Sequence, residues 1–434
     1  MVTCNIKYDN NQQGVYYSGQ TLSGVIEINN EKKRDIKGVT LKIEGYAKCK
    51  WTESEGTGKR RRTVYYNGRD DYINTFSYLI GSFNSKQIEF SSGVHKFNFH
   101  CALPPQLPTS FESKYGYVRY QIKVEIERPW KTDIKNCFAF TVIKNFDLNY
   151  GNPQLKLPLK TETSKSFYMG LFSSQLLHMS AEIPFCGYVS GQFATISVFI
   201  NNESNVEVLE IIAELKKLIQ YNSDTPRMRT KQRIESCAVS KDKGVPTKSK
   251  LSTEIILVIP AVPPTNTGTC RVINVFYEIH VTARVKGFHR NPYVVIPITI
   301  GTVPLISMTT GMYPQLPQND TSELTAGWSM PMPQQQPSSS ATAPLSLPLQ
   351  IPLQPTRIAP SAPQPTTPED YGDMPPPSYH EAMNMPTTSE IDNDEGLNDQ
   401  QPFNPRYPVF NFGIQPPNQP PSYSSNDDEK KMPY

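Results

Sequence analysis

The sequence predicts an all-β protein with two tandem, immunoglobulin-like β-sandwich domains followed by a disordered, proline-rich tail. Three observations support this prediction. Apolar and polar residues alternate in many segments of the first 310 residues, one strand pattern occurs twice, and 25 of the 40 prolines lie in the last 124 residues. The predicted boundaries are 1–150 for the first domain, 151–166 for a linker, 167–310 for the second domain and 311–434 for the tail.

Alternation is clearest between Val118 and Glu127. Apolar side chains take every second position from Val118 to Ile126, and polar or charged ones fill the positions between them. Successive side chains of a strand point to opposite faces, so this segment predicts a strand with one dry face. The same alternation recurs in 39–44, 96–103 and 194–200, with turn-forming residues between these segments. Repeated short strands separated by turns predict an antiparallel sandwich.

The strand pattern V-x-Y-x-I-x-V begins at Val118 and again at Val275, an offset of 157 residues. Two shorter matches occur in the same order, at offsets of 156 and 167 residues: Leu103-Pro104 with Ile259-Pro260, and Ser23-Gly24 with Ser190-Gly191. Three ordered matches favour two copies of one fold. The segment from Val206 to Ile219 fits both a helical face and a strand, and we predict a strand because the rest of the domain is β.

Charge divides the chain. The tail holds four Lys or Arg and fourteen Asp or Glu, a net charge of −10; subtraction from the totals of 43 and 40 leaves 39 basic and 26 acidic residues before it, a net charge of +13. A basic folded surface favours anionic lipid headgroups or phosphorylated peptides, and a solvated surface shielded by its own tail is the alternative. We therefore expect peripheral contact with an anionic membrane, and we expect no nucleic-acid partner.

The sequence indicates neither an enzyme nor a disulfide-bonded secreted protein. Seven scattered cysteines without a CxxC pair favour reduced thiols in a cytosolic protein. No signal peptide opens the sequence, and no apolar run approaches the roughly 18–20 residues of a membrane span. The six histidines form no metal-ligand spacing, and no P-loop, G-x-S-x-G or dinucleotide glycine pattern occurs. We expect no catalytic residue, no metal and no cofactor.

Two tail motifs carry the strongest functional signal, 376–379 and 420–423. Each is a PPxY peptide, the ligand type of WW domains, in which adjacent prolines hold polyproline II geometry and the tyrosine fills a second pocket. Their tyrosines are 44 residues apart, which gives a flexible span of roughly 35–40 Å and allows bivalent capture. The predicted WW contacts are Pro376, Pro377, Tyr379, Pro420, Pro421 and Tyr423.

A third tail motif, Tyr407-Pro-Val-Phe410, fits the Y-x-x-Φ form of endocytic sorting signals. It lies in an aromatic island, Phe403 to Phe412, which is unusual for an inert linker. Tyr407 and Phe410 are therefore candidate sorting residues. The tail has no lysine between Gly311 and Glu429, so ubiquitin would attach to the body, to Lys430 or Lys431, or to a bound partner.

Two basic runs have plainer interpretations. Residues 59–62, Lys-Arg-Arg-Arg, follow two glycines between strand candidates and favour a solvated hairpin loop over a nuclear import signal. Arg227, Arg229, Lys231 and Arg233 alternate as one face of a strand would; they could meet phosphorylated cargo, or form a solvated face.

Several segments of the body together carry a family resemblance: Tyr17–Gly24, Gly45–Lys48, Gly93–Phe99, Leu103–Pro105, Pro108–Glu112, Tyr115–Trp130 and, in the second domain, Ile298–Leu305. Those of the first domain resemble the N-terminal domain of the arrestins, and within that superfamily the match is to the α-arrestins, or arrestin domain-containing proteins. The resemblance covers about residues 5–305 and is completed by the two PPxY motifs.

The resemblance implies two arrestin sandwiches and a non-enzymatic adaptor role. The tail of such a protein recruits HECT-type ubiquitin ligases through their WW domains, and the body meets membrane receptors or transporters, which are ubiquitinated, endocytosed and sent to endosomes. The expected location is the cytoplasm, with recruitment to the plasma membrane and endosomes. No catalytic residue is implied.

Two alternatives stay open. Thioredoxin-interacting protein, a member of the same family, engages thioredoxin through a cysteine of its second domain, which suggests a redox or metabolic regulator. The loop expected to carry that cysteine, 241–251, has none, and nearby Cys237 falls in a predicted strand, where it resembles a buried apolar residue. The other alternative is a WW-binding scaffold without a ubiquitin outcome.

Overall fold

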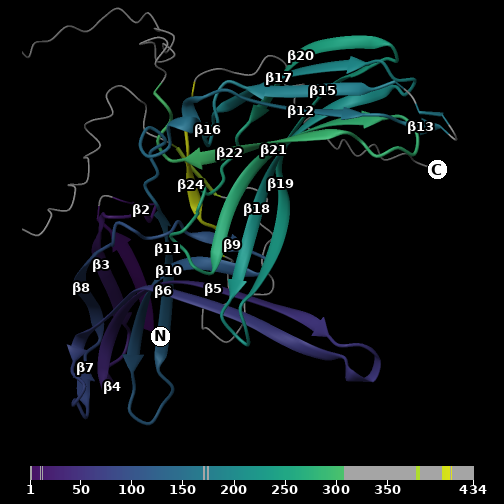
Figure 1. Ribbon diagram of the computed structural model, residues 1–434. Helices are drawn as coiled ribbons and strands as arrows, with labels where there is room; N and C mark the ends of the chain where they lie inside the picture. Colours follow the sequence, from purple (N-terminus) through teal and green to yellow (C-terminus); the bar gives the residue numbers. More distant parts are fainter. Residues whose placement is uncertain are drawn as a thin grey trace, which may run out of the picture. The chain divides into compact units, whose positions relative to one another are not determined.

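The computed structural model describes residues 2–9, 11, 13–169, 172–173, 175–306, 378–381, 403–410 and 412. In these residues the regular elements are strands, apart from two single-turn 3-10 helices, η1 (Gly58–Arg60) and η2 (Pro153–Lys156). Figure 1 shows the strands gathered into two sandwiches, in purple to blue and in teal to green. The prediction of an all-β fold with two sandwiches is confirmed.

The first sandwich has a three-stranded sheet opposite a larger one. The three-stranded sheet has the order β1-β3-β8, and the path of the larger sheet is β2-β11-β10-β5-β6, with β9 added beside β10. A small pair, β4 (Arg34–Ile36) with β7 (Ile88–Phe90), closes one end. The main strands are β1 (Val2–Tyr8), β2 (Val15–Tyr17), β3 (Thr21–Asn30), β5 (Gly38–Glu55), β6 (Arg62–Gly81), β8 (Gly93–Ala102), β9 (Phe111–Ser113), β10 (Gly116–Glu127) and β11 (Ile134–Ile143).

The second sandwich repeats this plan. One sheet has the order β12-β15-β17-β20 and the other β16-β22-β21-β18-β19. Its strands are β12 (Leu159–Lys165), β15 (Leu177–Ile183), β16 (Gly187–Val189), β17 (Phe193–Asn202), β18 (Val208–Ser223), β19 (Arg229–Val245), β20 (Ser249–Val258), β21 (Ile273–Val285) and β22 (Tyr293–Gly301). A short pair, β13 (Tyr168–Met169) with β14 (Phe172–Ser173), lies between β12 and β15 in the chain.

The duplication inferred from the sequence is visible in the topology. The larger sheets match strand for strand: β2 pairs parallel to β11 as β16 pairs parallel to β22, and β10 lies between β5 and β11 as β21 lies between β18 and β22. The repeated pattern at Val118 and Val275 falls in the equivalent strands β10 and β21. The hydroxyls of Tyr120 and Tyr277 each donate to a proline carbonyl at 2.7 Å.

One of the three matches was misplaced. The turn that contains Ser190-Gly191 corresponds to Ser18-Gly19, because both turns follow the short parallel strand and both glycines have φ near +90°. Their N–H groups donate to Leu103 and Ile259, which confirms the second match. Ser23-Gly24 lies inside β3 instead, so the offset of 167 residues was wrong. A two-residue pattern could not separate the turn from the strand that follows it.

Two further expectations are confirmed. The segment expected to be a strand at 206–219 forms most of β18, which alternates buried and less buried residues and lies between β19 and β21. In the basic run at 59–62, residues 59–61 lie in the loop of the long β5–β6 hairpin and Arg62 begins β6; all four are exposed.

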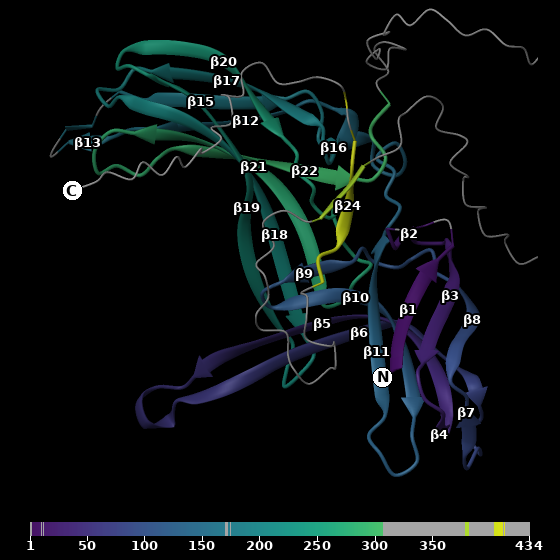
Figure 2. The same cartoon turned by 180° about the vertical axis from the view of Figure 1, so that it is seen from behind.

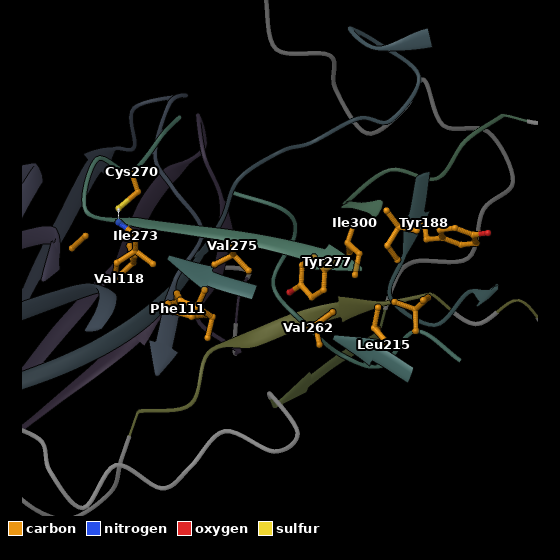
Figure 3. Close-up of a cluster of buried hydrophobic side chains, with 14 of the residues drawn as sticks. Phe111, Val118, Tyr188, Leu215, Val262, Cys270, Ile273, Val275, Tyr277 and Ile300 are labelled. Carbon is orange, nitrogen blue, oxygen red and sulfur yellow. Dashed lines mark hydrogen bonds between the residues drawn. The ribbon is translucent and has the colours of Figure 1, made fainter. Parts of the chain in front are cut away.

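The two sandwiches share one continuous apolar cluster. Figure 3 draws Phe111 and Val118 of the first sandwich together with Ile273 and Val275 of the second. A side-chain carbon added to Gly116 would lie 3.0 Å from Ile273. Backbone hydrogen bonds join the same region: Asn67 donates to Thr225 at 2.9 Å and accepts from residues 224 and 225. Unfolding one sandwich would therefore expose apolar surface of the other.

Two pieces of the segment expected to be disordered form strands, β23 (Ser378–Glu381) and β24 (Arg406–Val409). They pair antiparallel with each other. Figure 2 shows β24, in yellow, close to both sandwiches. The physical reason is the aromatic island, which places Phe403, Tyr407, Phe410 and Phe412 within ten residues and so supplies apolar area that can be buried. Most of the predicted tail, including the second PPxY motif, lies outside the described residues.

Candidate functional site: the groove that holds residues 403–412

Tyr407 of the tail is buried completely against the first sandwich. Its ring packs with Val15 and Ile143, at the ends of the parallel pair β2 and β11. Its hydroxyl donates to the backbone carbonyl of Ser110 at 3.0 Å, and burial raises the pKa of Tyr407 well above its usual range, so the hydroxyl stays a neutral donor. Pro405 and Pro408 on either side are buried as well.

The first sandwich presents suitable acceptors because Ser110 is already fixed by β11. The amide of Ser110 donates to Val142, and its side-chain oxygen accepts from the Val142 amide at 2.9 Å, which leaves its carbonyl for Tyr407. One strand position away, the Thr141 hydroxyl accepts from the Arg406 amide at 3.2 Å. The tail thus satisfies polar groups of the groove while it fills apolar space.

The second sandwich holds the other end of the segment. The amide of Phe410 donates to the Ser190 carbonyl at 3.0 Å. Phe410 and Phe412 pack against a small apolar cluster: Leu148 and Leu155, which lie between β11 and β12, and Val189 of β16. The name "tail groove" is used below for this site, which is lined by Val15, Ser110, Thr141, Ile143, Leu148, Leu155, Val189, Ser190 and Gly191.

Both predicted sorting residues therefore lie in the tail groove. Tyr407 has no exposed surface, and Phe410 is half-buried. In this conformation a sorting adaptor could not reach the tyrosine, so its use as a sorting signal would require the segment to leave the groove. The sequence signal for docking is the aromatic island itself. From the sequence alone, this island predicted only a sorting signal that another protein would recognise.

The first PPxY motif is linked to the groove through β23. Ser378 pairs with Val409 and Tyr379 with Pro408, and the pairing continues to Glu381 opposite Arg406. The backbone of Tyr379 is thus part of a two-stranded ladder with the docked segment. The remaining predicted WW contacts, Pro376, Pro377, Pro420, Pro421 and Tyr423, lie outside the described residues.

A buried ion pair lies on the outer face of the larger sheet of the first sandwich, where the sequence predicted solvent. Arg119 of β10 forms two hydrogen bonds with Glu112 of β9, and both side chains are 4% exposed. The Arg119 guanidinium also lies over the Tyr117 ring at 3.9 Å. Burial raises the pKa of Glu112 to about 7, against the opposing attraction of Arg119. Glu112 also contributes to the raised pKa of Tyr407.

The alternating basic residues 227–233 lie on β19 and on the turn before it, and three of the four contact the first sandwich. Arg227 pairs with Glu55, and Arg229 lies 3.6 Å from Glu53. The Lys231 ammonium lies 4.8 Å from the Tyr115 ring, whereas Arg233 pairs within its own strand. These half-exposed pairs contribute little stability each, and they use charges that the sequence had left open for phosphorylated cargo.

A polar cavity of about 460 Å³ on the first sandwich has the lining expected of an anion site, since it includes Lys42, Arg69, Lys123 and Lys135. Its cations are already paired: Lys42 and Lys123 with Glu44, Lys135 with Glu125, and Arg69 with Asp71. The four cations that line the cavity therefore form ion pairs with acidic side chains, and the cavity does not present a cationic site for an anion.

Glu44 provides a pH-dependent test of this network. Burial tends to raise its pKa, but hydrogen bonds from Lys123, Lys42 and Gln121 outweigh burial and lower the pKa to about 2. A carboxylate with a lowered pKa stabilises the fold above its unfolded value of 4.5, and this contribution is lost as pH falls toward 2. The Glu44→Gln variant should therefore unfold more easily than the wild type at pH 6, with the difference vanishing near pH 2.

Denaturant unfolding at several pH values measures this difference. The Lys123→Met variant removes one of the three hydrogen-bond partners of Glu44 and should reduce, without abolishing, the pH dependence of the free energy of unfolding. Parallel profiles for the wild type and Glu44→Gln would contradict the assignment.

Cys237 offers little for thiol chemistry. It lies in β19, half-buried, and packs against the apolar cluster. Burial raises the pKa of its thiol, which reduces the thiolate fraction that a mixed disulfide requires. All seven cysteines are free thiols.

Within the described part of the chain, no cluster of three or more His, Cys, Asp or Glu side chains could hold a metal ion. None of the described helices is long and apolar enough to cross a membrane.

Comparison with known proteins agrees with this architecture. The family model described as "Arrestin (or S-antigen), N-terminal domain" matches residues 4–149, and that described as "Arrestin (or S-antigen), C-terminal domain" matches residues 173–305. Arrestin domain-containing protein 17 of Caenorhabditis elegans is 26% identical over 310 residues, which are 69% of this chain and 70% of that protein.

Two mouse proteins are also similar to this chain. Arrestin domain-containing protein 4 is 26% identical over 309 residues, covering 68% of this chain and 71% of that protein. Arrestin domain-containing protein 1 is 24% identical over 290 residues, covering 67% of this chain and 62% of that protein, less than two thirds of its length.

Proposed function

Because this chain belongs to the arrestin family and its relatives are arrestin domain-containing proteins, we propose that it is a trafficking adaptor whose tail recruits WW-domain ubiquitin ligases of the HECT type. The body would meet membrane receptors or transporters. Ubiquitination of this cargo would then promote its endocytosis and endosomal transport. The adaptor would work from the cytoplasm and be recruited to the plasma membrane and endosomes.

The observation that carries the proposal is the pair of PPxY motifs behind two arrestin domains. Each motif combines two prolines, which favour polyproline II geometry, with a tyrosine for the second pocket. Two motifs on one chain allow two WW modules of one ligase to bind together, which would raise the affinity about a hundredfold over one motif. The net charge of +13 before the tail would favour an anionic membrane surface near the cargo.

The test is binding of purified WW domains to the full chain and to its Tyr379→Ala, Tyr423→Ala and double variants. We expect each single change to weaken binding of a tandem-WW protein about a hundredfold, because bivalent capture is lost, and the double change to abolish it. Serine-to-alanine changes at Ser378 and Ser422 are matched controls, since this position is variable in the motif. Equal binding by all four proteins would refute ligase recruitment through these motifs.

A ubiquitin outcome separates an adaptor from a WW-binding scaffold. In a reconstituted reaction with a HECT-type ligase, the adaptor should direct ubiquitin to lysines of the body, to Lys430 or Lys431, or to a cargo tail, because 311–429 contains no lysine. The redox alternative has less support, since burial disfavours the Cys237 thiolate. A mixed disulfide trapped at Cys237 with thioredoxin would restore it.

A further inference from the structure

The tail groove holds a segment of this chain that also holds the first PPxY motif. We propose that docking of residues 403–412 in the tail groove withholds the motif at Tyr379 from WW domains, so that docking of Tyr407 and WW binding at Tyr379 exclude one another. This inference rests on the proposed WW function and adds a competition between two sites of the same tail.

The groove holds the aromatic segment through both polar and apolar contacts. Three of its polar groups bond to the tail: the carbonyls of Ser110 and Ser190 and the hydroxyl of Thr141. Tyr407 fills the apolar space on the first sandwich, and Phe410 and Phe412 cover that on the second. The segment therefore contacts both sandwiches through side chains that are spaced along one short stretch.

The docked state is one that a partner could displace. Burial of one complete aromatic side chain and two partial ones favours docking, whereas ordering the segment and β23 costs backbone entropy at every residue. These terms oppose each other, so the net free energy of docking is smaller than the burial term alone. A protein that binds only the undocked tail would shift this equilibrium by mass action.

The competition follows from the backbone. In the docked state, residues 378–381 lie in an antiparallel ladder with residues 406–409. A WW domain instead requires its ligand in polyproline II geometry, whose φ near −75° differs from the roughly −140° of antiparallel strands. The ladder also occupies one edge of the Tyr379 backbone. A WW domain must therefore remove β23 from β24 before it can take the motif.

The two sandwiches provide a matched pair of variants. Gly191 and Gly19 occupy equivalent turns with φ of +91° and +90°, so an alanine is equally strained in both. At Gly191 the added carbon would lie 2.1 Å from the Phe410 carbonyl oxygen, so the tail cannot stay docked. At Gly19 it would meet only Pro105, at 3.8 Å. Gly191→Ala should release the tail, and Gly19→Ala is its control.

The experiment measures the affinity of a single purified WW domain for the first motif alone. The full chain carries Tyr423→Ala, so that only the Tyr379 motif can bind, and a synthetic peptide of residues 372–385 serves as the undocked reference. We expect the peptide to bind about tenfold tighter than the full chain, a factor equal to the inverse of the undocked fraction. Gly191→Ala should bring the full chain to the affinity of the peptide, and Gly19→Ala should leave it unchanged.

Tyr407→Ala is a second releasing variant, in case Gly191→Ala destabilises the body, and should have the same effect. Hydrogen exchange gives an independent measure: the amides of Arg406 and Phe410, which donate to Thr141 and Ser190, should lose protection when the WW domain is added. Equal affinities of the peptide and the full chain, or equal effects of Gly191→Ala and Gly19→Ala, would overturn the competition. A peptide that fails to bind any WW domain would instead refute the proposed function, and this inference with it.

Discussion

Replacing Arg119 with alanine is expected to lower the free energy of unfolding by about 3–5 kcal/mol, because it leaves the buried Glu112 carboxylate without its partner. Both side chains are 4% exposed, and Arg119 is bound to Glu112 through two nitrogens. Water cannot replace the lost hydrogen bonds at this depth. Chemical denaturation of the wild type and the variant at pH 8 measures the loss.

The loss should depend on pH in a defined direction. The pKa of Glu112 is already raised to about 7 by burial, and removal of Arg119 raises it further. A carboxyl whose pKa is higher in the folded state than its unfolded value of 4.5 favours folding at low pH, and this contribution is lost as pH rises. The deficit of Arg119→Ala relative to the wild type should therefore stay constant below about pH 6 and widen above about pH 7, where Glu112 of the wild type ionises while Glu112 of the variant stays protonated.

The matched control is the double variant Glu112→Gln, Arg119→Met. It keeps the volume of the pair but removes both charges, a change that is often nearly neutral in buried pairs. Recovery of most of the lost stability would show that the cost comes from the unpaired charge. If Arg119→Ala unfolds like the wild type at pH 8, the pair is not buried in solution.

The sandwiches could be predicted because their signal is local. In β10 the buried apolar residues fall on alternate positions from Val118 to Ile126, as strand periodicity requires. The same periodicity assigned Arg119 and Gln121 to a solvated face, yet they are 3% and 2% exposed. Periodicity identifies the face of the sandwich interior, but it gives no information on what covers the opposite face.

The tail groove could not be predicted from local pattern. Tyr407 and its acceptor Ser110 are 297 residues apart, and the groove exists only after both sandwiches have formed. The sequence showed an aromatic cluster in a proline-rich tail, which is consistent with docking on this chain or with recognition by another protein. The partners of Arg227 and Arg229 on β5 were hidden for the same reason.

Truncation of one equivalent core residue in each sandwich tests whether the two copies fold as one unit. Ile122 and Ile279 are 157 residues apart, occupy the same place in β10 and β21, and have no exposed surface. Ile122→Ala and Ile279→Ala should each lower the free energy of unfolding by about 2–5 kcal/mol, through lost burial and the cavity left behind. Thermal or chemical unfolding of each variant measures the loss.

We expect each variant to shift one common transition, because the apolar cluster continues from one sandwich to the other and residue 67 is hydrogen-bonded to residues 224 and 225. Separating the sandwiches would expose that shared surface, so neither should unfold alone. Ile234→Ala, on a side chain that is 60% exposed, is the control and should change stability by less than about 0.5 kcal/mol. Two transitions, each sensitive to only one variant, would show instead that the sandwiches unfold independently and that the tail groove can open between folded halves.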